Sequence, residues 1–226
     1  DSILNQNIDK LESIIIDANS DDNSLQIIKK LSIKDQRIKF LSEDDEGHFY
    51  GINKGLKLVK GNIIGMLHCS DVYEKNIFNL VNEEFKKDPD LWILGGSNIL
   101  KFKNKKKYSI NKKAKYLNVN DIVNFDFPAI ESTFFRKEVF TEFGNFSTNR
   151  FLKRCHTNMF INYFLGTIEK QKKIKIINQN LSYHLEHDNI RPKNSRNSKT
   201  TSHYSNGRKL ASYYAIKKFD KILDQN

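Results

Sequence analysis

The residues most able to do chemistry in this chain are acids that follow apolar, strand-like runs. Asp17 ends the run IIID, and Asp71 follows the run NIIGML within the segment 42–71, which also places acids and a glycine before an Asn-Lys-Gly helix. A strand that delivers a carboxylate to a loop is a common way to build a metal or phosphate site, because carboxylate oxygens are good ligands for hard cations. The pattern therefore predicts a metal or phosphate site near these acids.

The elements that must position these acids alternate between strand and helix. Strands are expected at about 12–16, 37–43 and 62–71, with one helix after an acidic turn capped by Ser20 or Asp22 and another ended by Gly61. Short connections of this kind predict an α/β fold with a mostly parallel sheet covered by helices. Because ligands gather at the carboxyl ends of parallel strands, Asp17 and Asp71 are expected at the same edge.

The rest of the chain continues the alternation. An amphipathic helix is expected at 74–90, strands or a hairpin at 91–102, and a strand running into a short helix that Gly144 ends. Further predicted elements are a helix at 150–167, a late strand pair at 173–187, a polar connection at about 189–206 and a final helix at 207–223.

Composition sets limits on the class of protein. The 226 residues are 38% hydrophobic and include two cysteines, and no apolar run approaches twenty residues. A chain of this kind is neither wholly disordered nor membrane-spanning. Cys69 and Cys155 lie in apolar or mixed stretches without zinc spacing, which favours reduced thiols in the cytosol.

The net charge of +11 is concentrated in two blocks, at 101–116 and in the C-terminal region. Such charge favours nucleic acid, anionic lipid or a nucleotide as partner, although a general bias toward Lys, Ile and Asn explains it equally well. Nucleic-acid binding predicts aromatic residues among the lysines, and Tyr108 and Tyr116 supply little of that pattern. We therefore expect no nucleic-acid partner.

Three segments resemble the family 2 glycosyltransferases of the GT-A fold, which are inverting enzymes that use nucleotide-activated sugars. They are IIIDANSDDNS, SEDDEGHFYGINKGLKLVKGNIIGMLHCSDVY and STFFRKEVFTEFGNF, and the similarity covers residues 1–165 in order and with the family's spacing. The opening strand of the family, with its Thr/Pro and Tyr-Asn signature, is not found here. The sequence is therefore expected to be a fragment that is truncated at its N-terminus.

The resemblance implies a nucleotide site in two parts. At the end of the first strand Asp17, Ser20 and Asp22 match the family's Asp-Gly-x-Ser-x-Asp, and a carboxylate at Asp17 accepts from the uracil N3–H. Both aspartates could instead only cap the turn and the helix. The second part comprises Asp45, Gly47, Asn53 and Lys54, of which Asn53 and Lys54 could serve only to fix the loop.

The resemblance also implies a weakly ligated Mg²⁺ or Mn²⁺. The family usually has two successive acids where this chain has Ser70 and Asp71, so Asp71 is expected as the metal ligand and Ser70 near the nucleotide. His184 or His187 could add a further ligand. Their spacing of three on a strand points them to opposite faces, so at most one is expected at the metal.

The positions of the general base depart from the family pattern. Relatives have an Asp on the helix after the Gly-x-Phe segment, where this chain has His156, and Ile130 and Glu131 replace a His-Gln pair. His156 and Glu131 are the two candidate bases. The same departures are equally consistent with lost activity.

The domain organisation follows from these assignments. Residues 1–188 are expected to form the GT-A domain, with a nucleotide-binding half at 1–73 and an acceptor half at 90–188, followed by a basic tail at 189–226 that contains the last helix. The expected function is transfer of a sugar from a nucleoside diphosphate, UDP being favoured, to a polysaccharide or lipid-linked acceptor in cell-surface glycan synthesis. The expected location is cytoplasmic, with the basic tail touching the inner face of the membrane. The alternative is a non-catalytic member that binds nucleotide or glycan or assists assembly.

Overall fold

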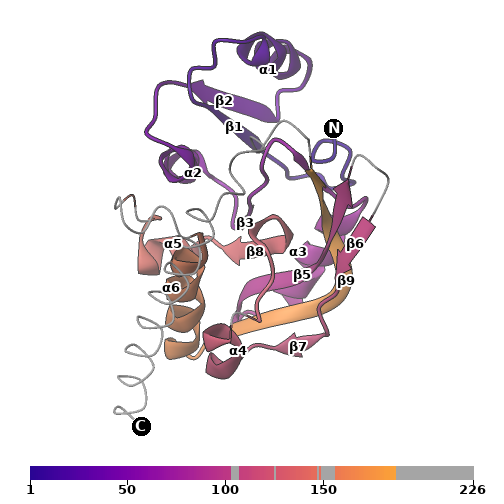
Figure 1. The fold of residues 1–226 in the computed structure, drawn as a ribbon, viewed down its shortest axis with the longest axis vertical. Coiled ribbons are helices and arrows are strands. Elements are labelled where there is room, and N and C mark those ends of the chain that lie inside the picture. The colour runs from indigo at the N-terminus through magenta and orange to yellow at the C-terminus, as the bar shows by residue number, and fades with distance from the viewer. Residues whose placement is uncertain (103–106, 125, 147, 149–155, 187–226) are drawn as a thin grey trace, which may run out of the picture.

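The computed structural model describes residues 1–102, 107–124, 126–146, 148 and 156–186 (Figure 1). Its main helices are α1 (Ser24–Lys34), α2 (His48–Leu58), α3 (Ile77–Lys87), α4 (Val119–Val123), α5 (Glu138–Phe143) and α6 (His156–Glu169), with a 3₁₀ turn η1 (Ile130–Ser132). Its strands are β1 (Ser13–Asp17), β2 (Ile38–Ser42), β3 (Ile63–Gly65), β4 (Asp71–Tyr73), β5 (Leu91–Phe102), β6 (Lys107–Ile110), β7 (Lys115–Tyr116), β8 (Thr133–Arg136) and β9 (Lys173–Glu186). Helices and strands alternate as an α/β protein requires.

The strands of the described residues form two sheets (Figure 1). β1 and β2 pair in parallel, with Ser13 opposite Ile38 and Asp17 opposite Ser42. The second sheet has the order β3-β8-β5-β9-β4, with β6 on β5 and β7 on β9. The carboxyl ends of β1 and β2 therefore lie side by side, whereas Asp71 belongs to the second sheet.

Strand direction in the second sheet corrects the expectation of a mostly parallel sheet. There β5 and β9 are parallel, and the pairs β3–β8, β4–β9, β5–β6, β5–β8 and β7–β9 are antiparallel. A parallel pair needs a long crossover between its strands, and β1–β2 and β5–β9 both have helices between them in the chain. The α/β class itself is confirmed.

The second sheet is buried on both faces, and the two faces have separate cores. One contains Trp92, Ile93 and Phe135 with residues of α5 and α6, and the other contains Leu94 and Phe134 with residues of α3. Adjacent residues Ile93 and Leu94 face opposite sides, as strand geometry requires. The register of β5 against β9 shifts between Leu91 and Ile93, which turns both Trp92 and Ile93 to the same face. The sheet that presents Asp71 is thus rigidly supported.

Several predicted elements differ from the structure. The expected strand at 62–71 is β3 followed by a loop, so Asp71 begins β4 instead of ending a strand. The expected strand pair at 173–187 is the one strand β9, and α2 ends at Leu58, before Gly61. Within the expected helix at 150–167, α6 begins at His156. Residues 149–155 and the tail, for which a final helix is expected, lie outside the described residues.

Candidate active site

Backbone pairing between β4 and β9 brings Asp71 opposite His184. The same register places Tyr73 opposite Ser182. Because residues two apart on a strand face the same side, all four side chains face one side of the sheet. Two strands far apart in sequence thereby build one polar site.

The Asp71 carboxylate is fully buried and only partly hydrogen-bonded. Its Oδ1 lies 2.6 Å from His184 Nδ1 and 3.4 Å from Ser70 Oγ. Its Oδ2 is buried, and no described protein group donates to it. A buried carboxylate oxygen without a donor destabilises the folded protein, so a ligand that binds this oxygen would be stabilising.

Glu131, on η1, lies beside Asp71 and His184. Within this turn Ser132 N donates a hydrogen bond to Ala129 O. Glu131 is 9% exposed, and Asn98 Nδ2 on β5 donates to its Oε1 at 3.2 Å. Burial raises the pKa of Glu131 and the nearby Asp71 carboxylate raises it further, while His68 and His184 act in the opposite direction. Two buried carboxylates therefore share one site, and burial there favours the protonated form of Glu131.

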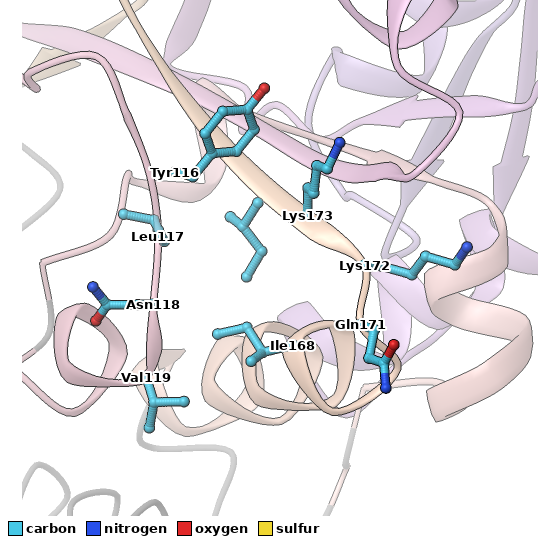
Figure 2. Close-up of a pocket in the computed structure, with 9 residues that line it drawn as sticks. Tyr116, Leu117, Asn118, Val119, Ile168, Gln171, Lys172 and Lys173 are labelled. Carbon is cyan, nitrogen blue, oxygen red and sulfur yellow. The ribbon is translucent and has the colours of Figure 1, made fainter.

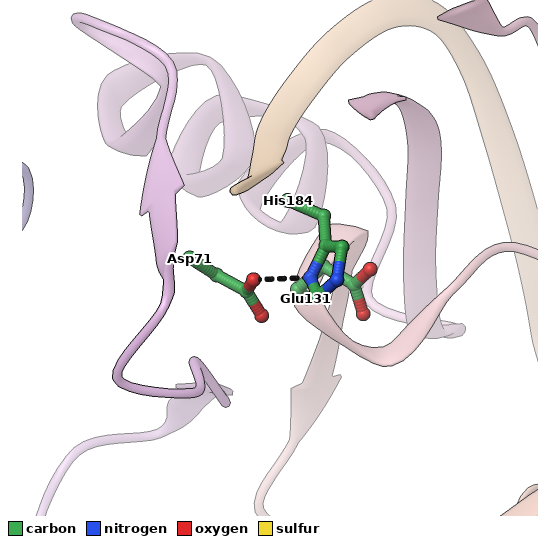
Figure 3. Close-up of side chains that lie close together, drawn as sticks. All are labelled: Asp71, Glu131 and His184. Atoms are coloured by element: carbon green, nitrogen blue, oxygen red, sulfur yellow. Dashed lines mark hydrogen bonds and ion pairs between the residues drawn. The ribbon is translucent and has the colours of Figure 1, made fainter. Parts of the chain in front are cut away.

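Asp71, Glu131 and His184 form a cluster with the composition of a metal site (Figure 3). Their ligand atoms all lie within 4.8 Å of one another, and the His184 side chain is 36% exposed while that of Asp71 is fully buried. Two carboxylates and one imidazole suit a divalent cation such as Mn²⁺. The cation would also satisfy Asp71 Oδ2, so the residues present fit the expected cofactor.

Two further polar groups on β4 and β9, Tyr73 and Ser182, were not selected from the sequence. Tyr73 OH and Ser182 Oγ are buried without a described partner, and burial raises the pKa of Tyr73 far above its usual value. The His68 and His48 rings lie 4.5 Å apart. The two-residue alternation from Asp71 to Tyr73 and from Ser182 to His184 could have revealed the first two.

Asp17 lies at the predicted carboxyl end of β1 and is 6% exposed. Ser20 Oγ donates to Oδ1 at 2.5 Å, and Ser20 N and Ser42 Oγ donate to Oδ2 at 3.1 and 2.7 Å. The bonds from Ser20 and then Ser42 lower the pKa of Asp17. The carboxylate is thus held ionised. Ser42, which was not among the predicted site residues, is paired opposite it.

The acidic loop after β2 folds over the end of β1. Asp45 Oδ1 accepts from Gly47 N at 2.8 Å, and Gly47 adopts φ +129°, a conformation that favours glycine. Asn19 Nδ2 donates to Asp44 Oδ1 at 3.0 Å. The two loops expected to form the nucleotide site are therefore linked directly.

Three other predicted nucleotide residues have structural contacts. Asp22 Oδ1 accepts from Ser24 N at the start of α1. Asn53 exchanges two hydrogen bonds with the backbone of Phe146, at 2.8 and 2.9 Å, and Lys54 Nζ donates to Asp44 O and pairs with Glu43. These contacts hold the loop and α2 in place, and a role of the three residues in nucleotide binding stays a prediction.

The remaining candidates are only partly described. Ser70 immediately precedes Asp71, and its hydroxyl contacts that carboxylate. His156 begins α6, but its side chain is outside the described part of the structure, and His187 is wholly outside it. The structure therefore gives the position of neither side chain relative to Asp71, Glu131 and His184.

A separate pocket of about 450 Å³ lies at the opposite end of β9 from His184 (Figure 2). It is lined by Tyr116, Leu117, Asn118, Val119, Ile168, Gln171, Lys172, Lys173 and Ile174. Lys172 pairs with Asp90 and Lys173 with Asp88. The pocket therefore has little unpaired charge and includes no residue of the predicted site.

The sequence profile described as glycosyl transferase family 2 matches residues 1–164. The chain belongs to glycosyl transferase family 2. A curated relative, a chondroitin synthase of Escherichia coli, is 34% identical over 91 residues, which are 40% of this chain and 13% of the relative. This chain thus spans a small part of that relative.

Solved structures show the same fold. The TarS 1–349 fragment of S. aureus in complex with UDP-GlcNAc matches with a TM-score of 0.62 and 14% identity, over 83% of this chain and 53% of the fragment. The mannosyltransferase PcManGT of Pyrobaculum calidifontis, in complex with GDP-Man and Mn²⁺, matches with a TM-score of 0.57 and 13% identity, over 99% of this chain and 68% of PcManGT. The expected GT-A fold is confirmed. Among the described residues, no helix is both long and apolar enough to cross a bilayer.

Proposed function

We propose that this family 2 chain is an inverting glycosyltransferase that moves a sugar from a nucleoside diphosphate, UDP being favoured, to a polysaccharide or lipid-linked acceptor in cell-surface glycan synthesis. The observation that supports it most is Asp71, a buried carboxylate with an unpaired oxygen beside His184. The TarS complex with UDP-GlcNAc and the PcManGT complex with Mn²⁺ support the nucleotide and the metal.

In this proposal the donor lies between the two acidic sites. Asp17 accepts from the uracil N3–H. Its Oδ1 accepts one described hydrogen bond, from Ser20 Oγ, and a carboxylate oxygen has a second lone pair that can accept another. Residues 1–73 form the donor half and 90–188 the acceptor half. Asp71 and His184 would hold Mg²⁺ or Mn²⁺, which when bound neutralises charge that develops on the departing diphosphate.

The proton of the acceptor hydroxyl requires a base near the anomeric carbon. Glu131 and His156 are the two candidates. The pKa of Glu131 is raised by burial, toward the range in which a carboxylate is an effective base. Histidine suits this role as a residue type, because the unperturbed imidazole titrates near neutral pH.

Two assays test this function. Purified protein with Mn²⁺ and UDP-sugars is expected to release UDP, and Asp71→Asn is expected to abolish the release. Absence of UDP release from the folded wild-type protein with any UDP-sugar and acceptor glycan would contradict the proposal. A protein that binds UDP under the same conditions without releasing it from a UDP-sugar would instead support the second candidate function, a non-catalytic nucleotide- or glycan-binding member. Ser70, in place of the first of the two successive acids, favours that candidate.

We further propose a cytoplasmic protein whose basic tail contacts the inner face of the membrane. The tail lies outside the described residues, so its charge alone supports this contact. Neutralising Lys209, Lys217 and Lys218 together should weaken binding to anionic vesicles. Unchanged vesicle binding would remove the membrane contact from the account.

A further inference from the structure

We propose that Glu131 is a metal ligand that replaces the acid absent at Ser70, so that the cation is held by Asp71, Glu131 and His184. The inference rests on the proposed function and assigns Glu131 a role other than that of general base. The three residues come from β4, η1 and β9, and their ligand atoms lie within 4.8 Å of one another (Figure 3).

The position of Ser70 explains why a second carboxylate is needed. Its Oγ lies 3.4 Å from Asp71 Oδ1, so residue 70 borders the site but brings no charge. Affinity for a hard divalent cation depends strongly on the number of charged oxygen ligands. Without Glu131 the site would have one carboxylate, and with Glu131 it regains two.

The surroundings of Glu131 favour a ligand over a base. Asn98, itself 3% exposed, donates to Oε1 and orients the carboxylate. Outer hydrogen-bond donors of this kind commonly orient the ligands of metal sites. A base must reach an acceptor hydroxyl, but Glu131 is 9% exposed and shares its site with Asp71. The base of the reaction is then left to His156.

The ligand set also predicts a preference between Mn²⁺ and Mg²⁺. Imidazole nitrogen favours transition metals over Mg²⁺ and Ca²⁺, whose preferred ligands are oxygens. His184 therefore makes the site selective for Mn²⁺ over Mg²⁺. This preference concerns the metal alone and needs no sugar or acceptor.

The test is titration of Mn²⁺ into the full chain without nucleotide, followed by the electron paramagnetic resonance signal of free Mn²⁺. Glu131→Gln keeps the shape of the side chain and removes its charge. It is expected to weaken Mn²⁺ binding at least about 10-fold. Loss of a group that only hydrogen-bonds to a metal ligand already lowers metal affinity about 10- to 100-fold. Glu83→Gln, at an exposed residue paired with Lys86 on α3, is the matched control and should bind like the wild type.

The outcomes separate this inference from the proposed function. If Glu131→Gln binds Mn²⁺ as the wild type does while Asp71→Asn does not, Glu131 is not a ligand, although the metal-dependent function stands. If the wild-type protein binds no Mn²⁺, both the inference and the metal-dependent donor site fail. Should Glu131→Gln not fold, Glu131→Asp provides the same test, because the shorter side chain keeps the charge but withdraws the oxygens. Mn²⁺ affinity of that variant within twofold of wild type would overturn the inference.

Discussion

Asp17 and Asp71 are buried to almost the same degree, 6% and 4% exposed, yet their surroundings are opposite. Asp17 has two serines donating to it, and its pKa is lowered. Asp71 has an oxygen without a described donor and a second carboxylate, Glu131, beside it. Burial therefore does not set the role of these carboxylates; the donors around them do.

The difference indicates that the two sites bind different parts of the donor. A carboxylate that hydroxyls already hold in its ionised form can accept one more neutral donor, such as a nucleobase N–H, in a charge-assisted hydrogen bond. A pair of carboxylates without enough donors gains most from a cation. The first site is suited to recognising the base of a nucleotide, and the second to binding the metal at its diphosphate.

The largest expected effect separates the two sites by their dependence on metal. Asp71→Asn should lower the affinity for UDP in Mn²⁺ by about 100-fold, the upper range for disturbed metal sites, and leave the affinity in EDTA unchanged. Asp17→Asn should weaken UDP binding in both conditions. Calorimetric titration of the two variants measures this. Equal losses in Mn²⁺ and EDTA for Asp71→Asn would remove the distinction.

Removal of a donor from Asp17 should have the next largest effect, on stability. Ser42→Ala leaves the buried carboxylate with one donor fewer, and a hydrogen bond to a charged group contributes about 2 kcal/mol to the free energy of unfolding. Urea unfolding at pH 7 measures the change, with Ser32→Ala on α1 as a control whose hydroxyl is exposed. Equal unfolding midpoints for the two variants would show that Asp17 does not depend on Ser42.

The lowered pKa of Asp17 has a consequence for acid stability. A carboxyl whose pKa is lower in the folded state stabilises the protein above its unfolded pKa, and that contribution is lost as the pH falls through the folded pKa. The wild-type protein should therefore lose more stability than Ser42→Ala when the pH falls below about 4. Parallel acid unfolding curves would argue against this role for the serines.

Glu131 should show the opposite pH dependence in EDTA. Because its pKa is raised in the folded state, the folded protein binds the proton more tightly, and stability falls as the pH rises from the unfolded pKa through the folded one. Glu131→Gln should lack this fall and melt higher than wild type at pH 7. A difference of about 1 kcal/mol would move the melting temperature by roughly 2–4 °C. A wild-type protein that is the more stable of the two in EDTA at pH 7 would contradict the raised pKa.

The smallest expected effect is at Lys54. Its described contacts from α2 are with Glu43 and Asp44 of the loop that precedes this helix, and an ion pair of this kind contributes up to about 1 kcal/mol. Lys54→Met should change UDP affinity by less than about 3-fold while lowering stability slightly. A loss of UDP affinity beyond 10-fold would instead make Lys54 a direct ligand of the nucleotide.

Local pattern was sufficient to predict the first part of the fold. The residues that end β1 and β2 are set by short connections, so Asp17 and the acidic loop were expected together and lie together. The pairing of Asp71 with His184 is different, since it depends on a register between strands 113 residues apart. Spacing alone showed only that His184 and His187 could not both face the metal.

The second sheet shows where sequence pattern fails. Strands or a hairpin were expected at 91–102, yet β5 runs unbroken through this range, including Gly95 and Gly96. A Cβ at Gly95 would lie 2.2 Å from Pro128, and one at Gly96 would lie 2.7 Å from Gln179 O. These glycines permit close approach of neighbouring chain segments rather than a turn, and the contacts that require them come from distant parts of the sequence.

Calorimetric titration of UDP into the wild-type protein, once with Mn²⁺ and once with EDTA, tests whether the donor site depends on a metal. A metal-dependent donor site predicts saturable binding of UDP that is much tighter with Mn²⁺. UDP binding of equal strength in both conditions, or none with either from a folded protein, would contradict the assignment of Asp71 and its neighbours as the metal site of a nucleotide-sugar donor.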